Sequence, residues 1–172
     1  MIELSPGAQA VVRLVEEVRA AAGANLHYLA LFGALALADI CGAATSDNGR
    51  SSGPKFKDWV SRHVPEQAGD SDNLWGLRCS LLHQGRAHPD GGSYPIAFTM
   101  PGTGQLHKLS TVVGDDRVGW MSIEMFVAEL TSGALRWLDD DGDTERVRRN
   151  LDKFARFRPE GLPPHIAGPV IA

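Results

Sequence analysis

Six segments of the chain repeat apolar residues at helical spacing. The first, Pro6 to Gly23, places valines and leucines on one stripe and charged residues opposite it. Ser5 and Pro6 are a typical helix start, because the serine hydroxyl accepts a bond from a free N–H group and proline lacks one. The second segment, Leu26 to about Gly42, is apolar nearly all round, which predicts a helix at the centre of a bundle. We expect Asn25 to cap this helix.

The other segments complete a mainly α pattern with one interruption. Between the fourth and fifth helices, apolar residues alternate as they do in half-buried strands, and this predicts a small antiparallel β insertion at about 94–121. We therefore expect a bundle of five to six helices. The tail, residues 159–169, is rich in proline and glycine, so it should be extended or loose. The remaining expected helices are Pro54–Val64, Ser71–Gly85, Ser122–Trp137 and Thr144–Phe154, and the strands are Tyr94–Met100, Leu106–Val113 and Val118–Met121.

Length and composition predict one soluble domain over residues 1–172. A chain of 172 residues with 43% hydrophobic residues can bury a core without staples, and no linker divides it. The amino terminus lacks a secretory pattern, and the longest apolar run, Leu26–Ala38, is shorter than the ~20 residues that span a bilayer. We expect a cytoplasmic protein with no membrane partner, in which Cys41 and Cys79 are free buried thiols.

The chain carries a small net negative charge, and its charged residues are unevenly distributed along the sequence. A net charge of −4 argues against a protein that coats nucleic acid through its overall field. Two stretches are locally basic, and they are either phosphate-facing patches or solvated helix faces. They contain Arg50, Lys55, Lys57 and Arg62, and Arg146, Arg148, Arg149, Lys153, Arg156 and Arg158.

Arg78 and His83 are the main candidate for chemistry, since both lie on an otherwise apolar predicted helix. At ~100° per residue their directions differ by about 140°, so either Arg78 reaches around the helix or the helix unwinds near Gly85. Cys79 and His83, four residues apart, are better aligned. A Cys79–His83 nucleophilic dyad, however, lacks an evident third group to orient it.

Histidine and arginine suit the cleavage of RNA. His83 can transfer a proton near neutral pH, and Arg78 can hold a phosphate and stabilise developing charge. The 2′-hydroxyl of RNA supplies the nucleophile, so no metal or other cofactor is required. The alternative is structural: Arg78 caps carbonyls or pairs with an acid, and His83 is stabilised by the helix dipole. Asp39 is either the partner of Arg78 or a helix-end acid in solvent.

Other polar residues extend or compete with this site. Gln84, Arg86 and His88 follow the predicted helix end, and they form either the rim of a nucleic-acid site or a simple turn. A zinc site would need tightly spaced ligands, which are missing apart from His83-x4-His88. Its candidate ligands would be Cys41, Cys79 and two of His63, His83 and His88.

The spacing Arg78-x4-His83 resembles the Arg-x4–6-His motif of HEPN-type helical domains. Many of these are metal-independent endoribonucleases that dimerise so that two motifs form one cleft. The resemblance implies a HEPN-like bundle, a homodimer, RNA as a possible partner, and catalytic roles for Arg78 and His83. It leaves as its rival a non-catalytic module of the same fold that binds a protein or a nucleotide. Supporting or substrate-binding roles would fall to Asp39, Cys79, Gln84, Arg86 and His88.

A longer similarity links the chain to a family of uncharacterised bacterial proteins, which brings no activity with it. This sequence departs from the common HEPN pattern at Cys79, where a polar residue such as Asn often follows the arginine. The similar segments are Asp39-Ile-Cys-Gly-Ala43, Phe56-Lys-Asp-Trp59, Arg78-Cys-Ser-Leu-Leu-His-Gln-Gly85, His88-Pro89 and Gly161-Leu-Pro-Pro164.

Overall fold

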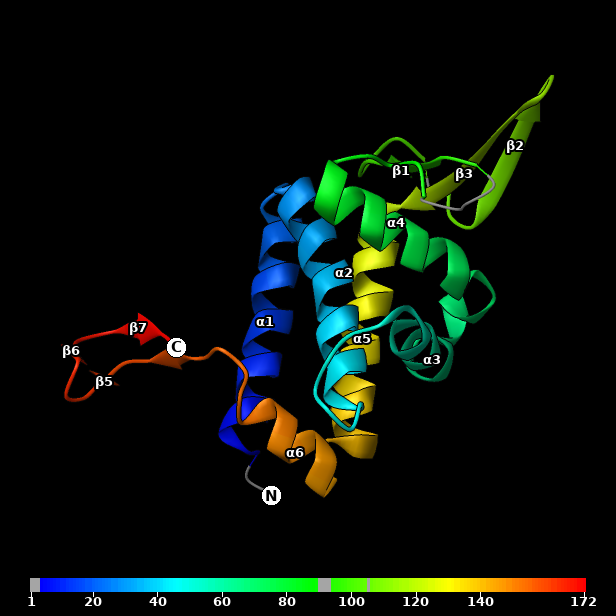
Figure 1. Ribbon diagram of the computed structural model, residues 1–172. Coiled ribbons are helices and arrows are strands. Elements are labelled where there is room, and N and C mark those ends of the chain that lie inside the picture. Colours follow the sequence, from blue (N-terminus) through cyan, green and yellow to red (C-terminus); the bar gives the residue numbers. More distant parts are fainter. Residues whose placement is uncertain (1–3, 90–93, 105) are drawn as a thin grey trace.

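The computed structural model describes residues 4–89, 94–104 and 106–172, and this part of the chain is mainly helical (Figure 1). A short 3₁₀ helix, η1 (Pro65–Asp70), precedes α4. The expected number of helices is confirmed, and most bounds differ by only a few residues. The helices are α1 (Pro6–Gly23), α2 (His27–Ala44), α3 (Gly53–His63), α4 (Ser71–Gln84), α5 (Ile123–Asp141) and α6 (Glu145–Leu151).

The start of α1 is capped by Ser5 as the sequence predicts, whereas Asn25 does not cap α2. The Ser5 hydroxyl accepts a bond from the N–H of Ala8 at 3.2 Å, and Ser122 caps α5 in the same way. The prediction that Asn25 caps α2 was wrong. Leu26 occupies the capping position without a side-chain bond, and Asn25 has a φ of 59°. Asparagine tolerates this left-handed conformation well, so it serves the turn between the helices.

The α2 helix lies at the centre of the bundle, against α1, α3 and α5 (Figure 1). It is long and apolar enough to cross a membrane by composition alone, but half of its residues are buried inside the protein. Its Leu35 and Leu37 are fully buried, as are Phe126 and Trp137 of α5. The prediction of a central core helix is therefore confirmed.

The β insertion is a mixed sheet with the order β1-β3-β2, made of β1 (Ile96–Thr99), β2 (Leu109–Val113) and β3 (Asp116–Ser122). The β2 and β3 strands form an antiparallel hairpin, whereas β1 runs parallel to β3. The prediction of a wholly antiparallel sheet was wrong. The chain reverses direction twice between β1 and β3, so the two strands point the same way when they become neighbours.

The tail is extended, as expected, but it is also paired with itself. It forms two small antiparallel ribbons that project from the α1–α6 side of the bundle (Figure 1). Arg13 of α1 lies over the ring of Phe157, 4.5 Å from its centre, at the base of the tail. The strands are β4 (Phe157–Arg158), β5 (Gly161–Leu162), β6 (Ile166–Ala167) and β7 (Val170–Ile171).

Candidate functional site

Arg78 of α4 is paired with Asp39 of α2. Its Nη2 lies 2.5 Å from Asp39 Oδ2, and the two side chains are only 17% and 13% exposed. Ser51, from the loop between α2 and α3, donates its hydroxyl to the other oxygen of Asp39. Of the two interpretations of Asp39, the structure therefore shows the ion pair.

His83 meets the same guanidinium from the other side. Arg78 Nη1 lies 3.0 Å from His83 Nε2, although the two residues leave the helix in directions that differ by about 140°. The helix does not unwind: α4 continues to Gln84, and Gly85 ends it with a φ of 67°. The long Arg78 side chain reaches around the helix instead. Because a guanidinium only donates, this contact makes Nε2 an acceptor, so the proton of a neutral ring is on Nδ1.

Trp75 completes the surroundings of Arg78. The guanidinium carbon lies 5.2 Å from the centre of the Trp75 ring, and that ring packs against Phe56 at 5.5 Å. The Nε of Arg78 is buried, with no hydrogen-bond partner among the described residues. The guanidinium is thus held by Asp39, His83 and Trp75, and the whole cluster ties α4 to α2.

The other predicted site residues lie around the end of α4. Gln84, Arg86 and His88 are exposed, as is His83, and Cys79 is half-buried. Cys41 and Cys79 are free thiols, and burial raises the pKa of Cys41. The described contact of the His83 ring is with Arg78 rather than Cys79, so the structure does not assemble the dyad.

A partly buried polar cluster around Glu129 escaped the sequence analysis. Glu129 of α5 accepts hydrogen bonds from Gln67 Nε2 at 2.6 Å and from His107 Nε2 at 2.9 Å. The other ring nitrogen of His107, Nδ1, accepts the N–H of Ser122 at 3.2 Å. These residues come from η1, the segment before β2, and α5, and no local spacing connects them.

His63 forms a third polar site, at the end of α3. It is 7% exposed and stacks near Trp59, and its ring nitrogens lie 3.8 Å from Asp140 and 3.5 Å from Asp141. Burial lowers the pKa of His63, and the two carboxylates only partly oppose this shift.

Across residues 4–89, 94–104 and 106–172, no group of three or more His, Cys, Asp or Glu side chains is placed to hold a metal ion.

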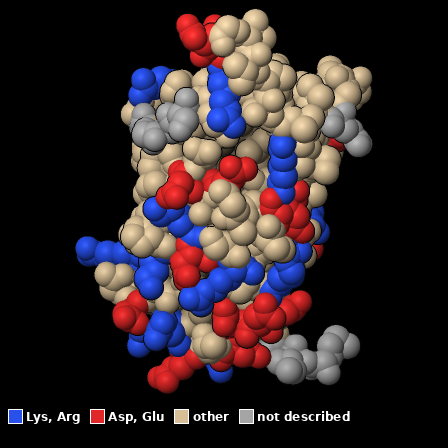
Figure 2. All heavy atoms as spheres, turned by 90° about the vertical axis from the view of Figure 1, so that its right-hand side faces the viewer, with Lys and Arg blue, Asp and Glu red and all other residues tan. Residues whose placement is uncertain are grey.

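Several residues of the two basic stretches are paired with acids. Lys57 lies 2.7 Å from Asp72, and Arg62 lies 3.0 Å from Asp58 on the same helix. In the α6 stretch, Arg146 lies 3.2 Å from an oxygen of Asp47. On the face with α3 and α4, acidic and basic side chains are interspersed (Figure 2). This arrangement favours solvated helix faces over phosphate-binding patches.

The structure thus brings Arg78, His83 and Asp39 together, adds Ser51 and Trp75, and leaves Gln84 and His88 on the nearby surface. Ser51 and Trp75 had no signal in the sequence, because a loop serine and a tryptophan on an apolar stripe are common features of any helical protein. Comparisons of the chain with protein-family models, with curated proteins and with solved structures find no match.

Proposed function

We propose that the chain is a HEPN-like domain that cleaves RNA at Arg78 and His83 without a metal ion. The observation that carries this proposal is the 3.0 Å contact between Arg78 Nη1 and His83 Nε2 at an exposed histidine. It joins a phosphate-binding group to a proton-transfer group at the protein surface. Asp39 holds the opposite edge of the guanidinium and so fixes the side of Arg78 that faces His83.

In this mechanism, Arg78 Nη1 turns from His83 to a phosphate oxygen when RNA binds, and the freed lone pair of His83 Nε2 removes the proton of an RNA 2′-hydroxyl. The 2′-oxygen attacks the adjacent phosphorus, the bond to the 5′-oxygen breaks, and a 2′,3′-cyclic phosphate forms. The departing 5′-oxygen takes a proton from water or from His83 of a second copy across a dimer cleft. Arg78 stabilises the negative charge that develops on the phosphate oxygens. Gln84, Arg86 and His88 would line the path of the RNA backbone.

One observation supports a second candidate, a non-catalytic module that binds a protein or a nucleotide. Arg78 is largely buried, and its ion pair with Asp39 joins α4 to the central helix. In this alternative the cluster stabilises the bundle, and His83 is a surface residue stabilised by the end of the helix.

The test is incubation of the purified protein with mixed RNA in EDTA. We expect the wild type to give fragments with 2′,3′-cyclic phosphate ends and His83→Ala to be at least about 100-fold slower. His165→Ala is the matched control, because it removes an exposed histidine from the tail and should leave the rate unchanged. Absence of cleavage by the folded wild-type protein would leave the binding module as the better explanation.

A further inference from the structure

The β2–β3 hairpin projects from the bundle, and β2 forms an outer edge of the sheet (Figure 1). All five residues of β2 are exposed, with Leu109 at 52%, Val112 at 64% and Val113 at 78%. In the sheet order β1-β3-β2, one side of the β2 backbone has no strand beside it among the described residues. An unpaired edge of this kind is a template for another strand.

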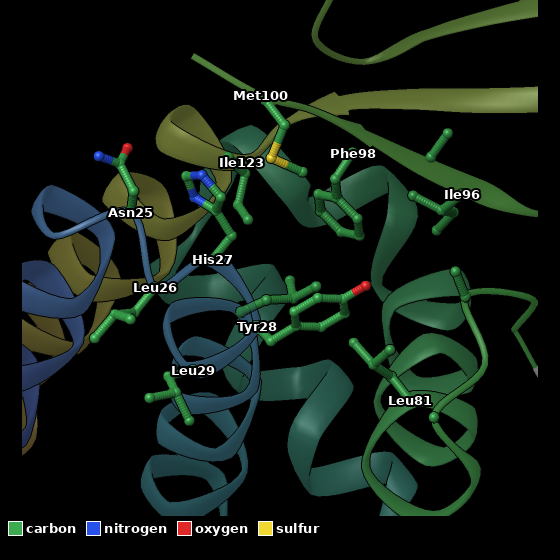
Figure 3. A pocket seen from close by; sticks show the side chains of 14 residues that line it. Asn25, Leu26, His27, Tyr28, Leu29, Leu81, Ile96, Phe98, Met100 and Ile123 are labelled. Atoms are coloured by element: carbon green, nitrogen blue, oxygen red, sulfur yellow. The ribbon is translucent and has the colours of Figure 1, made fainter.

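The β1 strand, at the opposite edge of the sheet, is tied to the rest of the protein. Phe98 and Met100 of β1 point toward the first turns of α2 and line an apolar pocket with Tyr28 (Figure 3). The N–H of Ile96, at the start of β1, donates to the carbonyl of Ala87 at 3.0 Å. The β1 strand is thus held against the bundle, whereas β2 extends away from it and is free to add a strand.

The sequence of β2 lacks the features that usually prevent strand addition. Leu109-Ser-Thr-Val-Val113 contains no charged residue and no proline, and it pairs with β3 residue by residue without a bulge. A two-residue turn joins Val113 to Asp116, and the residues that flank such a turn bond each other. Because bonding alternates along an antiparallel strand, the N–H and C=O groups of Ser110 and Val112 point to the open edge.

We propose that two copies of the chain pair through β2, antiparallel and centred on Thr111. This register places Ser110 of each copy opposite Val112 of the partner subunit, so the open N–H and C=O groups of one strand meet those of the other. The two sheets then form one continuous sheet across a two-fold axis, and the same patch serves both copies. Every β2 residue meets an uncharged residue, so no like charges oppose each other along the strand.

Charges at the two ends of β2 favour a second copy in the antiparallel direction. Lys108 precedes the strand, whereas Asp115 and Asp116 follow it. The Lys108 side chain is 29% exposed and lies 3.8 Å from Glu129, beyond hydrogen-bonding distance, so its ammonium group can take a second partner. Antiparallel pairing brings the basic end of each β2 beside the acidic end of the other, and parallel pairing would put like charges together.

The experiment is sedimentation velocity of the full chain at about 1–500 µM, since a short interface of this kind gives a weak, reversible dimer. Thr111 faces itself across the two-fold axis, so one substitution puts like charges directly opposite each other. We expect the wild type to dimerise, and Thr111→Lys and Thr111→Asp each to dimerise at least about tenfold more weakly. An equal mixture of the two variants should regain the dimer as a heterodimer. Thr111→Val, the control, removes the same hydroxyl without adding charge and should dimerise as the wild type does.

A further variant tests the backbone contact itself. Val112→Pro removes an N–H that points to the open edge and none that bonds β3, so the hairpin should persist while dimerisation weakens at least about tenfold. Circular dichroism checks that each variant is folded. A wild type that stays monomeric to about 500 µM, a dimer that persists in the charged and proline variants, or a mixture that fails to regain the dimer would overturn the proposal. The inference is independent of the proposed RNA cleavage, because no residue of β2 belongs to the Arg78–His83 site.

Discussion

His83 and His107 occupy opposite kinds of environment in one molecule. The His107 side chain is 8% exposed, and both of its ring nitrogens are bonded within the protein, to Glu129 and to the N–H of Ser122. His83 is exposed, and its described ring contact is the one between Nε2 and Arg78. Proton transfer needs a ring nitrogen that a substrate can reach. The comparison therefore assigns His107 to the structure and leaves His83 as the candidate for chemistry.

The largest expected effect is on folding stability. His107→Ala leaves the buried N–H of Ser122 without its acceptor and Glu129 Oε1 without the imidazole donor, which should lower the free energy of unfolding by about 2–3 kcal/mol. His83→Ala, at an exposed position, should change it by about 0.5 kcal/mol or less. Urea unfolding of the two variants measures both values. A greater loss for His83→Ala would reverse the comparison and favour a structural role for the Arg78 cluster.

A smaller effect is expected at Asp39. Asp39→Asn keeps the shape of the side chain but removes the charge that faces the partly buried Arg78, so it should cost about 1–2 kcal/mol in urea unfolding. Asp39 positions Arg78 and does not touch RNA in the proposed mechanism. The variant should therefore cleave more slowly than the wild type but faster than His83→Ala, with an unchanged pH profile. A rate as low as that of His83→Ala, or an altered pH profile, would place Asp39 in the chemistry itself.

The smallest effect concerns His63, a buried histidine that faces carboxylates without close hydrogen bonds. Its pKa is lowered on folding, mainly by burial, so the unfolded chain takes up this proton at higher pH. The free energy of unfolding should fall as the pH drops below the ordinary histidine pKa of about 6.5, because His63 is then protonated only in the unfolded chain. The contribution of His63 to this fall should stop once the pH is below its pKa in the folded protein, where both states carry the proton. His63→Gln should reduce the difference in unfolding free energy between about pH 7.5 and about pH 5. An unchanged difference would assign the acid sensitivity to other groups.

The helices could be predicted from sequence because each is determined by local signals. The caps at Ser5 and Ser122 and the left-handed end at Gly85 are all local features. The direction of β1 could not be predicted, because alternation gives the two faces of a strand and not its neighbours. The pairing of the tail strands was missed for a similar reason, since two-residue strands carry no periodic pattern.

The candidate site shows the same limit. The sequence indicated Arg78 and His83 and offered Asp39 as a partner, and the structure contains both contacts. The two residues leave the helix in different directions, which made a direct contact between them unexpected. The contact forms because the arginine side chain is long enough to reach around the helix. Ser51 and the Glu129 cluster depend on residues that meet only after the chain has folded. No spacing rule within one element can find such contacts.

The parallel pairing of β1 with β3 affects the order in which this end of the protein assembles. The β2–β3 hairpin joins near neighbours such as Val113 and Asp116, whereas β1 joins residues as far apart as Ile96 and Gly119. Local hairpins close quickly, and more distant pairings follow at a greater entropic cost. Ser122 ends β3, caps α5 and donates its N–H to His107. Hydrogen exchange of this one amide should therefore report when the sheet and the bundle become a single cooperative unit.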